Sequence, residues 1–196
     1  ARVAIAGRGF AAVLDEARWR LLPSRLLAGR LAFAVEARMG GLRGGAEVSR
    51  TPLTWRADGL RANGDAAAIA NLVPLAAAWS PAGEIALEAP QIAWDGERAT
   101  GAATLEWRDG TSSLSTVRPL GSWRAQATAE GASVKLSLAT VKGPLRFAGN
   151  GTLDIPGRLA FSGEARAEPG RERDLESLLS LLGPRRADGA YGFGTR

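Results

Sequence analysis

Three aspartates are the first candidates for a catalytic or metal-binding site, because carboxylates act as general acids, general bases and ligands of hard cations. Asp95 and Asp109 each stand directly before a glycine, and Asp154 opens the sequence Asp-Ile-Pro-Gly. Short polar residues beside glycine or proline are typical of turns, where the side chain bonds to the local backbone. The sequence therefore predicts turns at all three positions rather than a catalytic site.

Histidine and cysteine are both absent from the 196 residues. Their absence excludes thiolate nucleophiles, Ser-His-Asp relays and histidine general bases, and it removes the usual ligands of zinc. The run Gly149-Asn150-Gly151 lacks the lysine and the following helix that a phosphate-binding loop requires. We therefore predict a protein that is not an enzyme and that binds neither a metal nor a cofactor.

The basic residues are spread along the chain and do not form runs. Lysine and arginine total 25 against 20 acidic residues, for a net charge of +5. Nucleic-acid-binding proteins usually cluster their basic residues or interleave them with aromatic ones. The pattern favours an ordinary solvated surface over one that meets anionic headgroups, and it predicts no nucleic-acid partner.

A two-residue alternation of apolar and polar side chains organises the segment from 114 to 168. Its apolar positions include Trp123, Ala125, Ala127, Ala129, Val134, Leu136, Leu138, Leu145, Phe147, Leu159, Phe161 and Ala165. Successive side chains of a strand point to opposite faces, so this alternation predicts half-buried strands. Glycine and proline turns about a dozen residues apart indicate antiparallel hairpins. With weaker alternation upstream, we predict a mainly β protein: a large, curved antiparallel meander sheet of about nine to eleven strands.

Other local signals mark turns and helices around this sheet. The stripe Leu175, Leu178, Leu179 and Leu182 predicts an amphipathic helix that ends at Gly183 and packs on its own core. The remaining predictions are a helical turn over 23–28, a loop bracketed by Gly40-Gly41 and Gly44-Gly45, a turn at 63–65 followed by a short helix near 65–72, a bulge at Pro90, and a last strand through Tyr191 and Phe193.

Two short helices cannot cover the apolar face of so large a sheet. The sheet must therefore roll up in a half-barrel-like way, split into packed layers or hold something apolar. Glycines at 149, 151 and 163 on the inward face permit sharp curling. We favour closure of the sheet on itself over a groove that holds lipid, and we expect the six tryptophans to lie in the core. A carbohydrate-binding surface would need tryptophans on the polar face.

Several runs resemble the type II secretion system protein N family over nearly the whole chain. They are Trp19-Arg20-Leu21-Leu22-Pro23 with Leu26 to Leu31, Pro119 to Ala125, Leu136 to Thr140, Gly143-Pro144-Leu145, Gly149-Asn150-Gly151, Leu159 to Ala165 and the helix from Leu175 to Gly183. The motif positions, all structural rather than catalytic, are Pro119, Gly121, Trp123, Gly143, Pro144, Leu145, Gly149, Gly151, Phe161, Gly163, Leu178, Leu179 and Gly183.

The resemblance implies the protein's location and role. Proteins of this family resemble bitopic inner-membrane proteins, which have one membrane-spanning helix and a large periplasmic domain. No stretch of this sequence approaches the roughly 20 apolar residues that a membrane span needs. We therefore expect residues 1–196 to be a single β-rich periplasmic domain whose membrane anchor precedes it. The expected function is export of folded proteins through contacts with the outer-membrane secretin or the inner-membrane platform. The alternative is a periplasmic module that binds or transfers lipid on the apolar concave face of the sheet.

Overall fold

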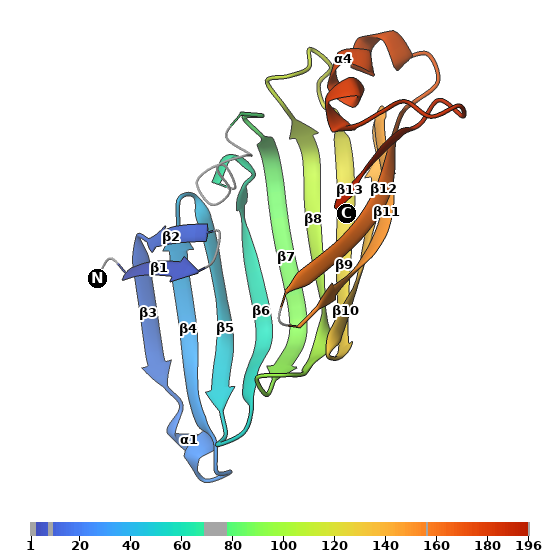
Figure 1. Cartoon of the computed structure of the whole chain (residues 1–196). Coiled ribbons are helices and arrows are strands. Elements are labelled where there is room, and N and C mark those ends of the chain that lie inside the picture. Colours follow the sequence, from blue (N-terminus) through green and yellow to red (C-terminus); the bar gives the residue numbers. More distant parts are fainter. Residues whose placement is uncertain (1–2, 8–9, 69–77, 156, 196) are drawn as a thin grey trace.

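Eleven consecutive strands form one antiparallel meander sheet (Figure 1). The computed structural model describes residues 3–7, 10–68, 78–155 and 157–195. The sheet contains β3 (Glu16–Leu21), β4 (Leu31–Met39), β5 (Leu42–Arg50), β6 (Trp55–Asp65), β7 (Ala82–Trp94), β8 (Ala99–Thr111), β9 (Gly121–Gly131), β10 (Ser133–Lys142), β11 (Leu145–Asp154), β12 (Arg158–Ala167) and β13 (Tyr191–Thr195). Each strand pairs with its neighbours in the sequence, so the predicted meander is confirmed.

Among the described residues, a hairpin and two helices flank the sheet. A separate hairpin of β1 (Val3–Gly7) and β2 (Phe10–Leu14) lies across β3 and β4 in the view of Figure 1. Helix α1 (Pro23–Leu26) follows β3 at one end of the strands, and helix α4 (Glu172–Leu182) lies at the opposite end. The predicted helical turn after Pro23, the terminal helix and the last strand are all confirmed.

The register separates the sheet into an apolar and a polar face. Apolar residues pair with apolar residues across the ladders, as in Phe33 with Val48, and Leu105 with Ala125. The residues between them, such as Thr104 opposite Gln126, point to the other face. The alternation predicted from the sequence therefore runs in register across the whole sheet.

The sheet curls strongly but does not close. β12 and β13 pass in front of β8 to β10 (Figure 1), yet the strand order ends at β13 on one side and at β3 on the other. The expected closure of the sheet on itself is therefore wrong. Aromatic rings of β9 and β11 contact each other across β10, with ring centroids of Trp123 and Phe147 5.5 Å apart. The curled part covers its apolar side chains fully or in part without closing into a barrel.

The fully buried core lies where α4 meets this curled part. Leu175, Leu178 and Leu179 of α4 are buried, as the apolar stripe predicts. They pack in one cluster with Val117, Leu120, Trp123, Leu145, Ala165 and Tyr191. Glu172 and Asp174 lie in the first turn of the helix, where carboxylates oppose the positive end of the helix dipole. This core anchors one end of the sheet.

Several predicted turns are strand interiors instead. Gly44 and Gly45 belong to β5, residues 63–65 belong to β6, and Asp109-Gly110 forms a bulge within β8. A Cβ on Gly44 would lie 2.7 Å from the carbonyl oxygen of Arg61, so glycine permits close strand approach there. The bulge at Pro90 is confirmed by a register shift in β7. Of the helix predicted near 65–72, residue 65 is in β6, Ala67 and Ala68 are helical, and 69–72 lie outside the described residues.

Candidate functional site

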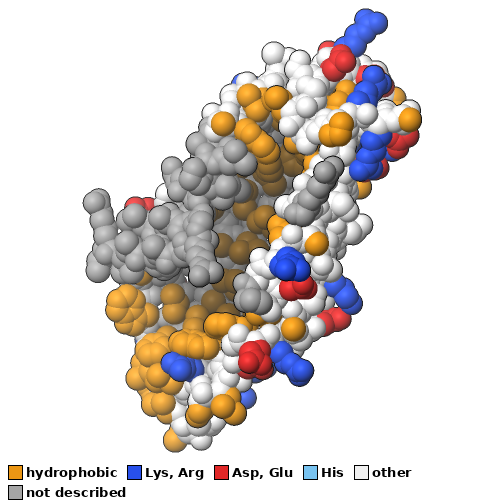
Figure 2. All heavy atoms as spheres, in the orientation of Figure 1, with side chains coloured by type: hydrophobic (Ala, Val, Ile, Leu, Met, Phe, Trp, Pro, Cys, Tyr) orange, Lys and Arg blue, Asp and Glu red, His pale blue; other side chains and the backbone are white. Residues whose placement is uncertain are grey.

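The apolar face of the eleven-stranded sheet forms a continuous concave surface, which we call the trough. Figure 2 shows hydrophobic side chains lining its hollow. Its side chains, two from each strand in order from β3 to β13, include Trp19 and Leu21, Phe33 and Val35, Leu42 and Val48, Trp55 and Leu60, Ile85 and Leu87, Leu105 and Trp107, Ala125 and Ala127, Leu136 and Leu138, Phe147 and Leu153, Phe161 and Ala165, and Tyr191 and Phe193. Most of them are only half-buried.

The α4 end of the trough is filled by a row of aromatic rings. Trp107 and Trp123 have ring centroids 4.9 Å apart, and Phe147 continues the row from Trp123. The centroid of Phe193 then lies 5.7 Å from that of Phe147 and 6.2 Å from that of Phe161. Aromatic pairs at these separations are attractive beyond the area they bury. The row and α4 together close this end.

Glycines on the trough face give the rings their space. A Cβ on Gly149 would lie 2.8 Å from the ring of Phe161, and one on Gly163 would lie 2.6 Å from the ring of Phe193. Gly151 likewise lies under Phe161. A side chain at any of these positions would push the rings out, so the glycines permit the tight curl.

The other motif positions lie around the same core. Pro119 follows a cis peptide bond, and the backbones of Gly121 and Gly143 touch. The N–H of Leu145 donates to the carbonyl of Leu120 at 2.9 Å. The carbonyl of Pro144 accepts a hydrogen bond from the N–H of Glu168. Leu178 and Leu179 are buried, and Gly183 packs on the carbonyl of Gly192. The structure brings them together as a structural cluster, and their family-motif role remains a prediction.

The α1 end of the trough is exposed. Leu21, Leu31, Trp55 and Trp94 of its lining are between 41% and 45% exposed. Trp123 is buried and Trp107 is half-buried, whereas Trp19, Trp55, Trp79 and Trp94 are exposed. The expectation that tryptophans lie in the core therefore holds only near α4. No described element packs over the α1 end as α4 packs over the other.

Strand β3 is an edge with unpaired backbone groups. Among the described strands it pairs only with β4, and the N–H of Leu22 donates to the carbonyl of Ala32 at 2.9 Å just beyond the strand. Hydrogen-bonded pairs alternate along an antiparallel ladder. The backbone N–H and C=O groups of Ala17, Trp19 and Leu21 therefore point away from β4. Their side chains face the trough, so another strand added here would extend it.

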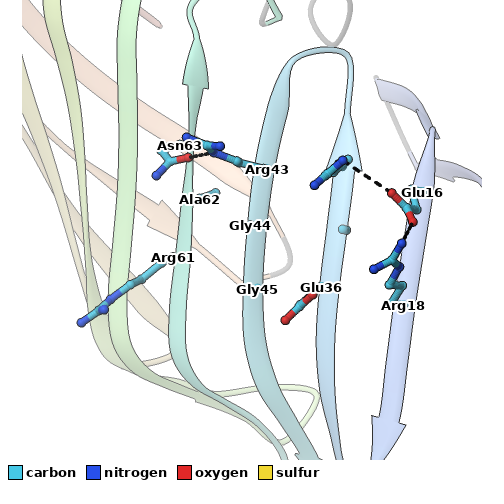
Figure 3. A pocket seen from close by; sticks show the side chains of 11 residues that line it. Glu16, Arg18, Glu36, Arg43, Gly44, Gly45, Arg61, Ala62 and Asn63 are labelled. Atoms are coloured by element: carbon cyan, nitrogen blue, oxygen red, sulfur yellow. Dashed lines mark hydrogen bonds and ion pairs between the residues drawn. The ribbon is translucent and has the colours of Figure 1, made fainter.

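The polar face carries solvated ion pairs. A shallow hollow of about 380 Å³ spans β3 to β6 (Figure 3), where Glu16 binds Arg18 at 2.6 Å and Arg43 Nε donates to Asn63 at 2.9 Å. Gly45 lies between Glu36 and Arg61 in the ladders and contributes no side chain to the hollow. Exposed pairs of this kind contribute little to stability. The hollow shows no chemistry beyond charge pairing.

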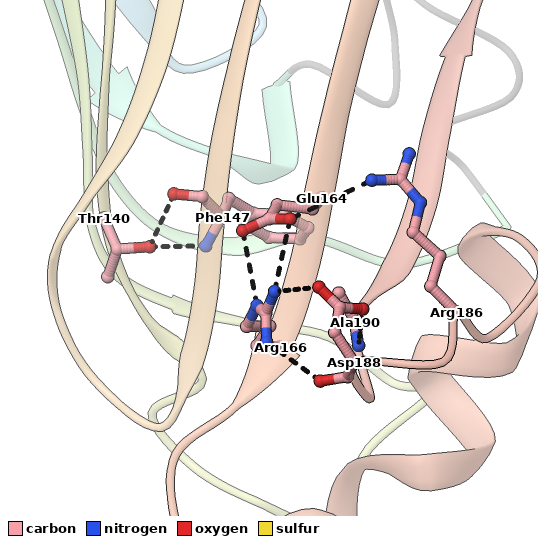
Figure 4. A network of polar contacts seen from close by, with 7 residues as sticks. All are labelled: Thr140, Phe147, Glu164, Arg166, Arg186, Asp188 and Ala190. Atoms are coloured by element: carbon pink, nitrogen blue, oxygen red, sulfur yellow. Dashed lines mark hydrogen bonds and ion pairs between the residues drawn. The ribbon is translucent and has the colours of Figure 1, made fainter.

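A second polar network ties the end of the chain to β12 (Figure 4). Arg166 contacts Glu164 at 3.3 Å and Asp188 at 2.5 Å, and Arg186 lies 3.9 Å from Glu164. The carboxylate of Asp188 accepts hydrogen bonds from the backbone N–H of Ala190 and from Arg166. Both bonds hold the pKa of Asp188 below its ordinary value, and the bond from Ala190 has the larger effect. The network therefore fixes the turn before β13.

The three aspartates have structural roles. The carboxylate of Asp95 accepts from the N–H groups of Glu97 and Arg98 at 3.0 and 2.7 Å, and these bonds lower its pKa in the predicted turn. Asp109 binds Lys142 at 2.8 Å, which lowers its pKa, but it lies in a bulge rather than a turn. Asp154 ends β11, and its carbonyl accepts from Gly157.

Within the described residues, no group of three or more His, Cys, Asp or Glu side chains is placed to hold a metal ion. In the same part of the chain, no helix combines the length and the apolar character needed to cross a membrane.

A comparison with known protein families matches residues 1–194 to the family model described as "Type II secretion system (T2SS), protein N". Neither the curated proteins nor the solved structures contain a significant match to the chain.

Proposed function

Because the chain belongs to the type II secretion system protein N family and so has a role in that system, we propose that it acts there as a non-enzymatic docking domain. In this proposal it lies in the periplasm as part of a bitopic inner-membrane protein. It assists export of folded proteins by binding the outer-membrane secretin or subunits of the inner-membrane platform.

Edge strand β3 is the proposed contact. A free edge accepts an added strand through main-chain hydrogen bonds, and side-chain pockets then give specificity. Ala17, Trp19 and Leu21 offer outward backbone groups, and Trp19 is 64% exposed. The opposite edge, β13, is shorter and contains Gly192 and Gly194, which have no side chains for a partner to contact. The single observation that carries the proposal is this unpaired strand beside exposed Trp19.

The test is a proline that blocks the edge. Ala17→Pro removes an outward N–H without removing a bond to β4, because proline is tolerated on the open side of an edge strand. We expect it to weaken binding to the secretin's periplasmic domains or to platform subunits about tenfold, a loss of about 1.4 kcal/mol. In cells, export of a type II substrate falls while lipid composition is unchanged.

The matched control is Ala17→Ser, which keeps the N–H and a small side chain and should leave binding and export unaltered. If the unmodified chain binds none of these components at tens of micromolar, the docking proposal is wrong. Equal binding by both variants would show that the contact lies elsewhere.

The trough supports a second candidate function, lipid binding. It is continuous from β3 to β13, and the described elements close only its α4 end. Monomeric proteins rarely leave an apolar surface of this extent in contact with water. An acyl chain would replace that water. Altered membrane lipids with secretion intact, in cells lacking the protein, would favour this function over docking.

Native mass spectrometry of protein purified from cells tests the lipid candidate. We expect bound lipid, and we expect Leu105→Glu to remove it, because the carboxylate would be placed in the middle of the trough. Thr104→Glu is the matched control, since Thr104 is the next residue on the polar face and is also half-buried. Purified protein free of lipid would contradict the candidate, as would equal lipid in both variants.

A further inference from the structure

We propose that the α1 end of the sheet is a docking surface for an anionic lipid bilayer. This surface, the α1 rim, consists of residues 22–31 and 50–55. Leu27 is 94% exposed and Leu53 is 82% exposed, while Leu26 and Leu31 are close to half-exposed. Figure 2 shows hydrophobic side chains gathered at this lower end of the molecule, where α1 lies in Figure 1. Leucines this exposed on two adjacent turns form a hydrophobic tip.

The charged residues of the rim itself are the arginines Arg25, Arg30 and Arg50, while the acidic residues Glu47, Asp58, Asp95 and Glu97 lie in the neighbouring strands and in the turn after Trp94. Residues 17–35 contain four arginines and no acidic residue, and residues 48–57 contain two arginines and no acidic residue. Arg25 is bound to Glu47 at 2.8 Å, and Arg56 lies 3.9 Å from Asp58. Among the described residues, Arg20, Arg30 and Arg50 form no ion pair. The hydrophobic tip therefore has cationic groups beside it, at Arg30 and Arg50, that no described acidic side chain neutralises.

A shallow hollow that is open to solvent lies between the two turns of the rim. It has a volume of about 450 Å³ and is lined by Leu26, Arg30, Leu31, Arg50 and Pro52, among others. The guanidinium carbon of Arg50 lies 4.7 Å from the ring centroid of Trp55. Guanidinium groups bind phosphate well, and tryptophan favours the boundary between headgroups and acyl chains. The hollow therefore brings cationic and interfacial side chains to one place.

This combination identifies a bilayer as the occupant. Surfaces that lie on membranes insert apolar side chains and place arginines at the level of anionic headgroups. An apolar protein partner would gain nothing from several unpaired arginines around the leucines. The opposite end of the molecule provides a contrast, because Leu181 is 69% exposed there but α4 carries three acidic residues and one arginine. An exposed leucine is therefore found at both ends of the molecule. The rim differs from the α4 end because its exposed leucines lie beside arginines.

Docking at this end would place the open mouth of the trough on the bilayer. Trp55 and Trp94 line that mouth and are 44% and 45% exposed. The inference does not depend on lipid inside the trough or on a partner at β3. Membrane docking can be measured separately from both.

Vesicle co-sedimentation of the full chain tests the proposal. We expect binding to vesicles of phosphatidylglycerol and phosphatidylethanolamine, weaker binding at higher salt, and little binding to phosphatidylcholine. Leu27→Glu combined with Leu53→Glu should weaken binding about tenfold, and Arg30→Glu combined with Arg50→Glu should do the same. Leu27 and Leu53 are exposed, so their replacement should leave thermal unfolding unchanged.

The matched controls lie on α4. Leu181→Glu replaces an exposed leucine and Arg173→Glu replaces an exposed arginine, and neither should alter vesicle binding. The proposal is overturned if anionic vesicles do not bind the chain, if neutral vesicles bind it equally, or if the α4 variants lose as much binding as the rim variants.

Discussion

Replacing Trp123 with alanine is expected to lower the free energy of unfolding by about 3–5 kcal/mol, the cost of truncating a buried aromatic side chain. Trp123 is 5% exposed and contacts both Trp107 and Phe147. Its indole N–H also donates to the carbonyl of Leu145 at 3.0 Å. The substitution would leave a cavity and remove that bond. Denaturant unfolding followed by circular dichroism provides the measurement.

Trp19→Ala is the matched control for this prediction. Trp19 faces the same side of the sheet but is 64% exposed, so its loss should cost about 1 kcal/mol or less. Equal destabilisation by the two substitutions would mean that the core does not lie at the α4 end.

The Gly143→Ala substitution is expected to cost about 3–4 kcal/mol, for two separate reasons. Gly143 has a φ of +114°, which L side chains rarely adopt. A Cβ there would also strike the Cα of Gly121 and lie 2.9 Å from the carbonyl oxygen of Leu120. Because both neighbours are backbone, neither can move aside cheaply. Denaturant unfolding again measures the change.

Gly96→Ala separates the two reasons. Gly96 has a nearly equal φ of +108°, but nothing lies within 4 Å of a Cβ placed on it. Its substitution should therefore cost only the backbone strain, about 1–2 kcal/mol. If both alanines proved equally destabilising, the close approach of Gly121 and Gly143 would have no energetic role.

The strands of the second half were predictable because their signal is local. Leu136 and Leu138 alternate with lysine and serine, and the ladder with β11 preserves that alternation residue by residue. Glycine misled the prediction in the first half. Gly44 and Gly64 lie inside paired strands, where a Cβ would meet the neighbouring strand. Turns and close approaches both favour glycine, and the residue type alone does not separate them.

The shape of the trough was less predictable than the assignment of side chains to its apolar face. The side on which Trp55 and Trp94 lie follows from alternation, but their exposure depends on which end of the sheet is covered. Curling rests on contacts such as Trp123 with Phe147, between strands that are not neighbours. A period of two residues contains no information about such contacts. The sequence consequently identified the apolar face correctly and predicted its closure wrongly.

The strictly sequential order of the sheet also affects how the molecule folds. Each ladder between described strands joins two strands that follow one another along the chain, so none of these strands needs a distant segment in order to pair. Stability then resembles a sum of nearest-neighbour terms, as in repeat proteins. Growth can begin at one hairpin and continue strand by strand, and opening begins at the ends. The free energy of local opening should accordingly fall from the α4-capped strands towards β3, which leaves β3 and β4 as the most readily exchanged part of the sheet.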